Sequence, residues 1–146
     1  VFTPLPVPLV EKNYFSLPTA GSILPPTIPL SIPAVLDGYW LVLVKPNDFI
    51  STREAYAAVT PRPSKVSLKD IISQPVKTWR GQMVNDFEAS VFPTHPVVSS
   101  ICDQLYMLGA SYAAMSGSGS TVYGLFRQQP VLGDVFSGCF LWQCKL

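Results

Sequence analysis

Charged residues are scarce in this sequence. Only 13% of its 146 residues are Asp, Glu, Lys or Arg, whereas 48% are hydrophobic, and the formal net charge is +1. This charge provides neither the basic surface of a nucleic-acid-binding protein nor an acidic tail. The excess of hydrophobic over charged residues indicates a surface that a further domain normally covers.

Histidine and cysteine are also rare, which limits metal and disulfide chemistry. His95 is the only histidine, and the three cysteines, Cys102, Cys139 and Cys144, contain no Cys-x-x-Cys pair. An odd number of cysteines is not a disulfide framework, and a zinc site needs more ligands than one histidine supplies. We therefore expect no metal site, buried free thiols, and a surface or helix-capping role for His95.

Long hydrophobic runs are absent as well. The longest apolar run lies near Trp40–Val44, far short of the roughly 20 residues that a membrane-spanning helix needs. The first residues do not form a basic segment followed by an apolar core, so no secretory signal is visible. These absences predict a soluble, cytoplasmic chain without membrane or nucleic-acid partners, long enough for one domain with a proper core.

What the sequence does contain is a dense run of glycine and hydroxyl residues. Residues 115–121 read M-S-G-S-G-S-T, and the segments on either side have the aromatic and β-branched residues of strands. Gly117 and Gly119 can adopt positive φ, so that neighbouring N–H groups turn toward one anion. The pattern predicts a strand, a glycine loop and a strand, with phosphate as ligand; the alternative is a tight turn without a ligand.

Two common phosphate-binding motifs do not fit this loop. A dinucleotide-binding fingerprint needs a third glycine where Val122 stands, and it needs a helix rather than a strand afterwards. A Walker loop needs a lysine after a glycine, and neither glycine is followed by one.

The segments before the glycine loop predict a central strand and a capped helix. Tyr39–Lys45 is almost continuously apolar, as in a strand that is covered on both faces. Ser51–Glu54 has the S-x-x-E pattern of a capping box, which opens a short helix through Val59. A further helix is expected over residues 94–108, where one stripe consists of Val97, Val98, Ile101, Leu105 and Leu108.

Shorter elements are expected between and after these segments. Ser67 is predicted to cap a short helix that Pro75 stops, and Val84–Phe92 to form another helix with Asn85 and Asp86 as N-terminal capping groups. The final strand is expected over Val135–Gln143.

Prolines dominate the first part of the chain. Alternating prolines in Thr3–Leu9 remove the N–H donors from one side, so a strand here would have to be an edge strand. Residues 10–38 contain five more prolines without helical or strand periodicity, which predicts an irregular or polyproline-like insertion. A ligand for a proline-recognising partner is a weaker alternative, since no P-x-x-P flanked by basic residues occurs.

The glycine loop and three earlier segments together resemble one family. Residues 115–126, M-S-G-S-G-S-T-V-Y-G-L-F, resemble the third signature motif of the GHMP kinases, which act on galactose, homoserine, mevalonate and phosphomevalonate. Leu41–Pro46, Ile50–Tyr56 and Asn85–Glu88 precede it in the order found in the branch that phosphorylates 4-diphosphocytidyl-2-C-methyl-D-erythritol. The similarity runs from Tyr39 to the last residue.

This resemblance implies the fold and the reaction. The fold would be α+β, a ferredoxin-like, mainly antiparallel four-stranded sheet with helices on one face, and residues 1–146 would form one GHMP kinase C-terminal domain. The reaction would be transfer of a phosphoryl group from ATP, with Mg²⁺, to the 2-hydroxyl of that substrate in non-mevalonate isoprenoid biosynthesis. In the family, the catalytic residues and the main ATP loop lie in the N-terminal half. No residue here is therefore expected to be catalytic, and we expect an inactive C-terminal fragment that partners its own N-terminal domain or self-associates.

The resemblance also implies the site residues. Thr52 and Tyr56 would line the cytidine end of the substrate, with the Tyr56 ring against the base, and the phosphate loop would comprise Gly117, Ser118, Gly119, Ser120 and Thr121. Thr52 as a mere first-turn residue and Tyr56 as a core contact remain alternatives. So do another GHMP kinase, of the mevalonate-pathway or homoserine type, and a non-enzymatic module that binds a small molecule or phosphate.

Overall fold

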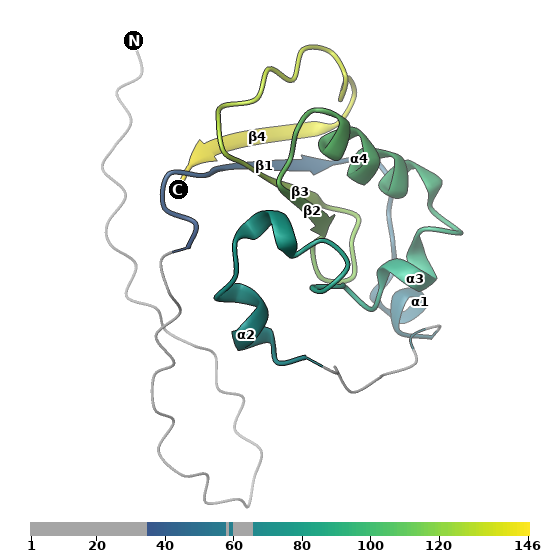
Figure 1. Ribbon diagram of the computed structural model, residues 1–146. Helices are drawn as coiled ribbons and strands as arrows, with labels where there is room; N and C mark the ends of the chain where they lie inside the picture. The colour runs from purple at the N-terminus through teal and green to yellow at the C-terminus, as the bar shows by residue number, and fades with distance from the viewer. Residues whose placement is uncertain (1–34, 58, 60–65) are drawn as a thin grey trace, which may run out of the picture. The chain divides into compact units, whose positions relative to one another are not determined.

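The computed structural model describes residues 35–57, 59 and 66–146 (Figure 1). Its strands are β1 (Trp40–Lys45), β2 (Tyr112–Met115), β3 (Val122–Phe126) and β4 (Phe140–Lys145). Its helices are α1 (Thr52–Ala57), α2 (Leu68–Ile72), the 3₁₀ helix η1 (Val76–Thr78), α3 (Glu88–Val91) and α4 (Pro96–Met107). The predictions for Thr3–Leu9 and for residues 10–34 lie outside the described residues.

The four strands form one antiparallel sheet in the order β2-β3-β1-β4. β1 is central, as its apolar sequence predicted. β1 and β2 run parallel on either side of β3, and the chain crosses between them through the helices, which is the split β-α-β arrangement of a ferredoxin-like sheet. The predicted α+β class with a four-stranded antiparallel sheet is confirmed.

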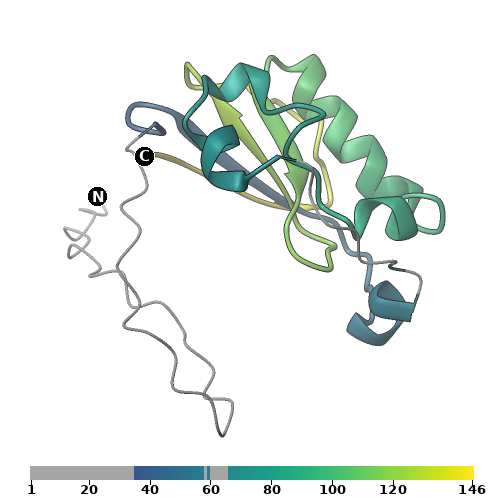
Figure 2. The ribbon, with the colours of Figure 1, turned by 60° about the horizontal axis from the view of Figure 1, so that its bottom comes forward.

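Hydrophobic side chains cover both faces of the sheet. On one face, Val42 of β1 belongs to the same buried cluster as Ile101 and Leu105 of α4. On the other face, Leu125 of β3 shares a second cluster with Ile71 of α2. Figures 1 and 2 show α4 and the α2–η1 segment on these two sides. The sequence predicted the first layer of helices but not the second.

Two predicted helices are shorter than expected. α1 ends at Ala57, and Val59 is not helical. α3 is a single turn, because the Asn85 side chain accepts a hydrogen bond from the Phe87 N–H at 3.0 Å and forms a local turn before the helix. Ser67 does occupy the N-cap of α2, although its hydroxyl makes no capping hydrogen bond.

α4 follows its predicted stripe with one exception. Val98, Ile101 and Leu105 are buried, but Val97 is 43% exposed, and Cys102 takes its place in the buried face. Burial raises the pKa of the Cys102 thiol to about 12. Cys139 and Cys144 are only partly buried, contrary to expectation, and all three thiols are free.

The last strand begins five residues later than predicted. Between Leu132 and Cys139 the chain makes successive turns, closed by hydrogen bonds such as Val135 N–H to Leu132 O and Cys139 N–H to Phe136 O. Leu132 and Phe136 are buried against the α4 side of the sheet, so this segment packs as turns rather than extending β4. The strand prediction was wrong here because the apolar side chains of this segment reach the same hydrophobic core from turns.

Within the part of the chain that the structure describes, no helix is long and apolar enough to cross a membrane. The same residues contain no group of three or more His, Cys, Asp or Glu side chains arranged to hold a metal ion.

β4 presents large hydrophobic side chains at the edge of the sheet. Phe140 is 64% exposed and Trp142 is 44% exposed, and both lie on the face opposite α4. Among the described strands, β4 pairs only with β1, so its outer backbone groups are open to a further strand. Such an edge favours association with another protein surface.

We expect the 146-residue chain to self-associate through this edge. Light scattering over a dilution series should give an apparent mass that rises with concentration. Trp142→Lys should reduce the association, because a lysine on an edge strand opposes strand pairing. Val131→Lys is the control, since Val131 is 88% exposed in a loop. A chain that stays monomeric throughout and binds no hydrophobic dye would contradict this expectation.

Candidate functional site

The predicted strand, glycine loop and strand form a β-hairpin, β2 to β3. The Ser116 N–H donates to Thr121 O at 2.8 Å, and the Gly119 N–H donates to Ser116 O at 3.0 Å. Gly117 has φ +56° and Gly119 has φ +87°, the left-handed region that glycine adopts at least cost. Among the described residues, the N–H groups of Gly117 and Ser118 have no protein acceptor, so they are available to an anion.

Two side chains from the α3 region hold the start of this loop. Asn85 Nδ2 donates to Met115 O and to Gly117 O, both at 2.8 Å. Glu88 Oε1 accepts from the Met115 N–H at 2.8 Å. The predicted capping of α3 by Asn85 and Asp86 is wrong, because the N-cap is Phe87 and no side chain caps it. Asn85 instead accepts from the Phe87 N–H in the turn before α3 and anchors the loop through its amide, whereas Asp86 is exposed.

The far end of the loop is buried against the segment that follows β1. Ser120 is 4% exposed, and its hydroxyl donates to Asp48 O at 2.6 Å. A Cβ added to Gly119 would come within 2.7 Å of Met115 Sδ and 2.9 Å of Ile50 Cδ1. Of the predicted loop, Gly117 and Ser118 therefore face a possible ligand, whereas the Ser120 hydroxyl is engaged inside the protein.

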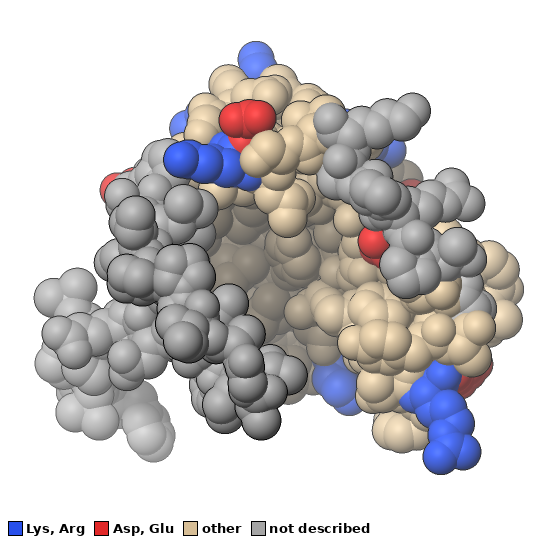
Figure 3. All heavy atoms as spheres, turned by 90° about the horizontal axis from the view of Figure 1, so that it is seen from below, with Lys and Arg blue, Asp and Glu red and all other residues tan. Residues whose placement is uncertain are grey.

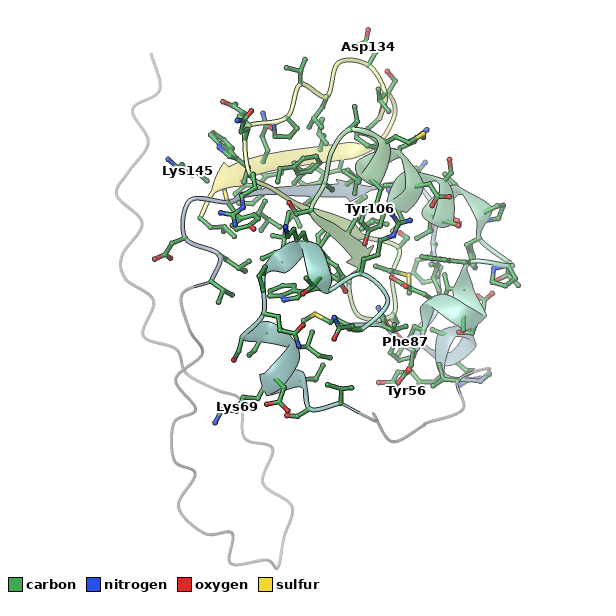
Figure 4. The ribbon with its side chains drawn as sticks, viewed as in Figure 1. Tyr56, Lys69, Phe87, Tyr106, Asp134 and Lys145 are labelled. Carbon is green, nitrogen blue, oxygen red and sulfur yellow. The ribbon has the colours of Figure 1, made fainter. Side chains whose placement is uncertain are left out.

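The residues predicted to bind the cytidine end lie on α1. Ser51 Oγ accepts from the Glu54 N–H at 3.1 Å, which is one half of the predicted capping box. Thr52, in the first turn, is exposed. Tyr56 is 63% exposed, so it is not a buried core residue, and its ring meets the edge of Phe87 with centroids 4.8 Å apart and planes at 73° (Figure 4). An exposed aromatic pair can stack against a planar ring such as a nucleobase.

A pocket of about 360 Å³ is lined by Phe87 of this aromatic pair and by Ser116 and Gly117 of the glycine loop. Its walls are Met83, Val84, Asn85, Phe87, Tyr112, Ala114, Met115, Ser116, Gly117 and Tyr123. Tyr56 and Ser118 are not among the lining residues, and no lining residue is charged. In the space-filling view from below, most of the described surface is tan, so Lys, Arg, Asp and Glu occupy only a small part of it (Figure 3).

Sequence reasoning missed the surroundings of His95. Its Nδ1 lies 2.9 Å from Asp48 Oδ2, and its Nε2 lies 3.3 Å from Glu54 Oε1. The hydrogen bond with Asp48 is the main cause that raises the pKa of His95 above its ordinary value of 6.5. The acidic neighbours are 47 and 41 residues away in the sequence, so only the fold brings them together.

Comparisons with known proteins show what the chain is similar to. Residues 68–135, which include α2 to β3 and the glycine loop, match the family described as GHMP kinases C terminal. This part of the chain is therefore similar to the C-terminal domain of the GHMP kinases.

Two individual proteins are similar to a longer part of the chain. The chain is 55% identical over 113 residues to the 4-diphosphocytidyl-2-C-methyl-D-erythritol kinase of Parabacteroides distasonis, covering 76% of this chain and 42% of that protein. It is 50% identical over 114 residues to the kinase of the same name from Bacteroides thetaiotaomicron, covering 78% and 40%. The chain thus spans about two fifths of the length of these relatives. A crystal structure of 4-(cytidine 5'-diphospho)-2C-methyl-D-erythritol kinase overlaps 59% of this chain and 33% of its own, with 26% identity and a TM-score of 0.49.

The partly buried Glu88 gives the site a pH-dependent component. Burial raises the pKa of Glu88 above its ordinary value of 4.5, and the hydrogen bond from the Met115 N–H offsets this only in part. The folded chain therefore holds this proton more tightly than the unfolded chain does. The contribution of Glu88 to stability is complete below about pH 4.5 and is lost as the pH rises through the folded pKa.

Glu88→Gln tests this, because the amide oxygen can still accept from the Met115 N–H but cannot ionise. We expect the free energy of unfolding of the variant, relative to the natural chain, to increase between pH 4 and pH 8. Urea unfolding at several pH values measures it. Asp103→Asn, on the exposed side of α4, is the control for the removal of one carboxylate. A difference for Glu88→Gln that does not change with pH would contradict the expectation.

Proposed function

We propose that this chain is the substrate-binding C-terminal domain of an ATP-dependent kinase that phosphorylates the 2-hydroxyl of 4-diphosphocytidyl-2-C-methyl-D-erythritol. One observation carries the proposal: the uncharged walls of one pocket include both Phe87, whose ring meets that of Tyr56, and Gly117, whose backbone N–H has no acceptor among the described residues. The first suits a cytosine ring, and the second suits a diphosphate. The names of the relatives support the same substrate.

The chain's own residues would bind and orient the substrate. Tyr56 would place its ring against the base, beside Thr52 in the first turn of α1. The Gly117 and Ser118 N–H groups would hold phosphate oxygens, while Asn85 keeps the loop open toward them. In phosphoryl transfer such positioning is a large part of catalysis, because the protein contributes geometry and charge stabilisation rather than covalent chemistry.

ATP and Mg²⁺ would bind mainly outside this chain. Among the described residues there is no cluster of acidic side chains that fits Mg²⁺. The relatives are more than twice as long as the matched region, so their remaining part can supply the ATP site, the metal ligands and the catalytic groups. We assign no catalytic residue to this chain. That remaining part, as an N-terminal domain, is also the partner that we propose for the apolar residues at β4.

A chimaera tests the proposed activity. The matched region of the Parabacteroides distasonis kinase would be replaced by residues 35–146 of this chain, and transfer of the γ-phosphate of labelled ATP to the substrate would be measured. We expect the chimaera to be active, and the 146-residue chain alone to be inactive and to bind Mg·ATP more weakly than micromolar. Tyr56→Ala in the chimaera should raise KM for the cytidine substrate by about 5- to 150-fold, the loss of one base–aromatic stack. A folded but inactive chimaera would overturn the proposal.

Gly117→Ala tests the phosphate role of the loop. A Cβ at Gly117 would meet no atom within 4 Å, so the stability cost is only that of alanine at positive φ, about 1–2 kcal/mol. If phosphate approaches this backbone, kcat/KM of the chimaera should fall by more than that cost explains. Gly119→Ala is less suitable, because its Cβ would press on Met115 and Ile50. Near-normal kcat/KM in a folded Gly117→Ala chimaera would mean that the loop is only a turn.

A further inference from the structure

His95 joins three separate segments of the described chain. It lies at the N-cap of α4, Asp48 lies in the connection after β1, and Glu54 lies on α1. Only 14% of the His95 side chain is exposed, compared with 29% for Asp48 and 52% for Glu54. The ring is thus largely enclosed between two carboxylates.

The geometry specifies the protonation state of the ring. An ionised carboxylate only accepts hydrogen bonds, and each ring nitrogen of His95 has a carboxylate oxygen within hydrogen-bond distance. Both nitrogens can donate only when the imidazole carries two protons and a positive charge. A neutral ring, with a single N–H, would release one of the two carboxylates.

Asp48 and Glu54 are both connected to the candidate site. The backbone oxygen of Asp48 accepts the hydroxyl hydrogen of buried Ser120, at the end of the glycine loop. Glu54 is two residues before Tyr56 on α1, whose first turn is also held by Ser51. The ring therefore links the segment that fixes the loop to the helix that carries the aromatic residue.

We infer that His95, as an imidazolium, is a positioning residue that holds α1 at a fixed place relative to the glycine loop. It touches neither end of the proposed ligand, and it acts through Asp48 and Glu54. The kinetic consequence rests on the proposed function, but the positioning itself does not.

We expect the position of α1 to depend on pH, because the contacts that hold it need the protonated ring. The charged groups acting on the ring, among the described residues, are Asp48 and Glu54, and both favour the protonated form. Because the folded pKa lies above 6.5, the two contacts are complete below pH 6.5 and are lost as the pH rises through the folded pKa. A positive charge at the start of α4 opposes the helix dipole, so the carboxylates must offset that effect too.

The first test is the titration of His95 in the 146-residue chain. Since His95 is the only histidine, its ring signals in an NMR spectrum need no assignment. We expect a pKa above 6.5 that falls in Asp48→Asn and, by a smaller amount, in Glu54→Gln. Asp103→Asn is the control and should leave it unchanged. A pKa at or below 6.5 in the natural chain would overturn the inference.

The second test is hydrogen exchange on α1 at one fixed pH below 6.5. The Ala55 N–H donates to Ser51 O and reports on the first turn of the helix. His95→Gln should speed its exchange by about three- to tenfold, between the effect of an exposed ion pair and that of a hydrogen bond to a charged group. Amides in the middle of α4 should not change. Unchanged exchange at Ala55 would contradict the positioning role.

The third test uses the active chimaera. His95→Gln should raise KM for the cytidine substrate and leave KM for ATP unchanged, because only α1 moves. An equal rise in both values would contradict the inference. Should the chimaera have no activity, the proposed function fails, while the titration and the exchange experiment still decide whether His95 positions α1.

Discussion

The structure around the site depends on how the outer edge of β2 obtains its hydrogen bonds. β2 is an edge strand, and its backbone groups cannot remain buried without partners. Side chains supply them: Glu88 accepts from the Met115 N–H, Asn85 donates to Met115 O, and the Tyr106 hydroxyl donates to Ala113 O at 3.0 Å. These contacts protect the edge from another strand and at the same time fix the hairpin to α3 and α4.

The same hydrogen bonds also fix the position of the glycine loop. The same Asn85 amide that serves Met115 also holds Gly117 O, and Ser120 anchors the other end of the loop to Asp48. Between these two anchors, the N–H groups of Gly117 and Ser118 have no acceptor among the described residues. The loop is thus rigid at both ends and open in the middle, which is the arrangement that preorganised anion binding requires.

Local patterns in the sequence predicted the elements that depend on local causes. The apolar run of β1, the S-x-x-E cap of α1 and the glycine loop between two strands all specify their structure within a few residues. The layer formed by α2 and η1 could not be predicted this way, because Ile71 and Trp79 meet the sheet only through the tertiary fold. The turns before β4 were misread as strand, since periodicity does not distinguish the buried Phe136 in a turn from one in a strand.

The residues of the candidate site also fall into two groups: those that the local sequence predicts and those that depend on the tertiary fold. The glycine loop and Tyr56 could be singled out from a motif, but the role of Asn85 in holding the loop depends on contacts 30 and 32 residues away. His95 is the clearest case, because its acidic neighbours are more than 40 residues distant in sequence. A lone histidine without a nearby acidic residue gives no local signal for such a contact.

Asn85 holds the glycine loop in place through the carbonyl oxygens of Met115 and Gly117, and Asn85→Asp tests this role. The replacement keeps the size and the oxygen that accepts from the Phe87 N–H, but it removes the donor to Met115 O and Gly117 O. Hydrogen exchange would be measured at the two loop amides that form internal bonds, Ser116 and Gly119. We expect both amides to exchange faster while the amides of α4 stay protected, whereas unchanged protection of the loop would contradict this role of Asn85.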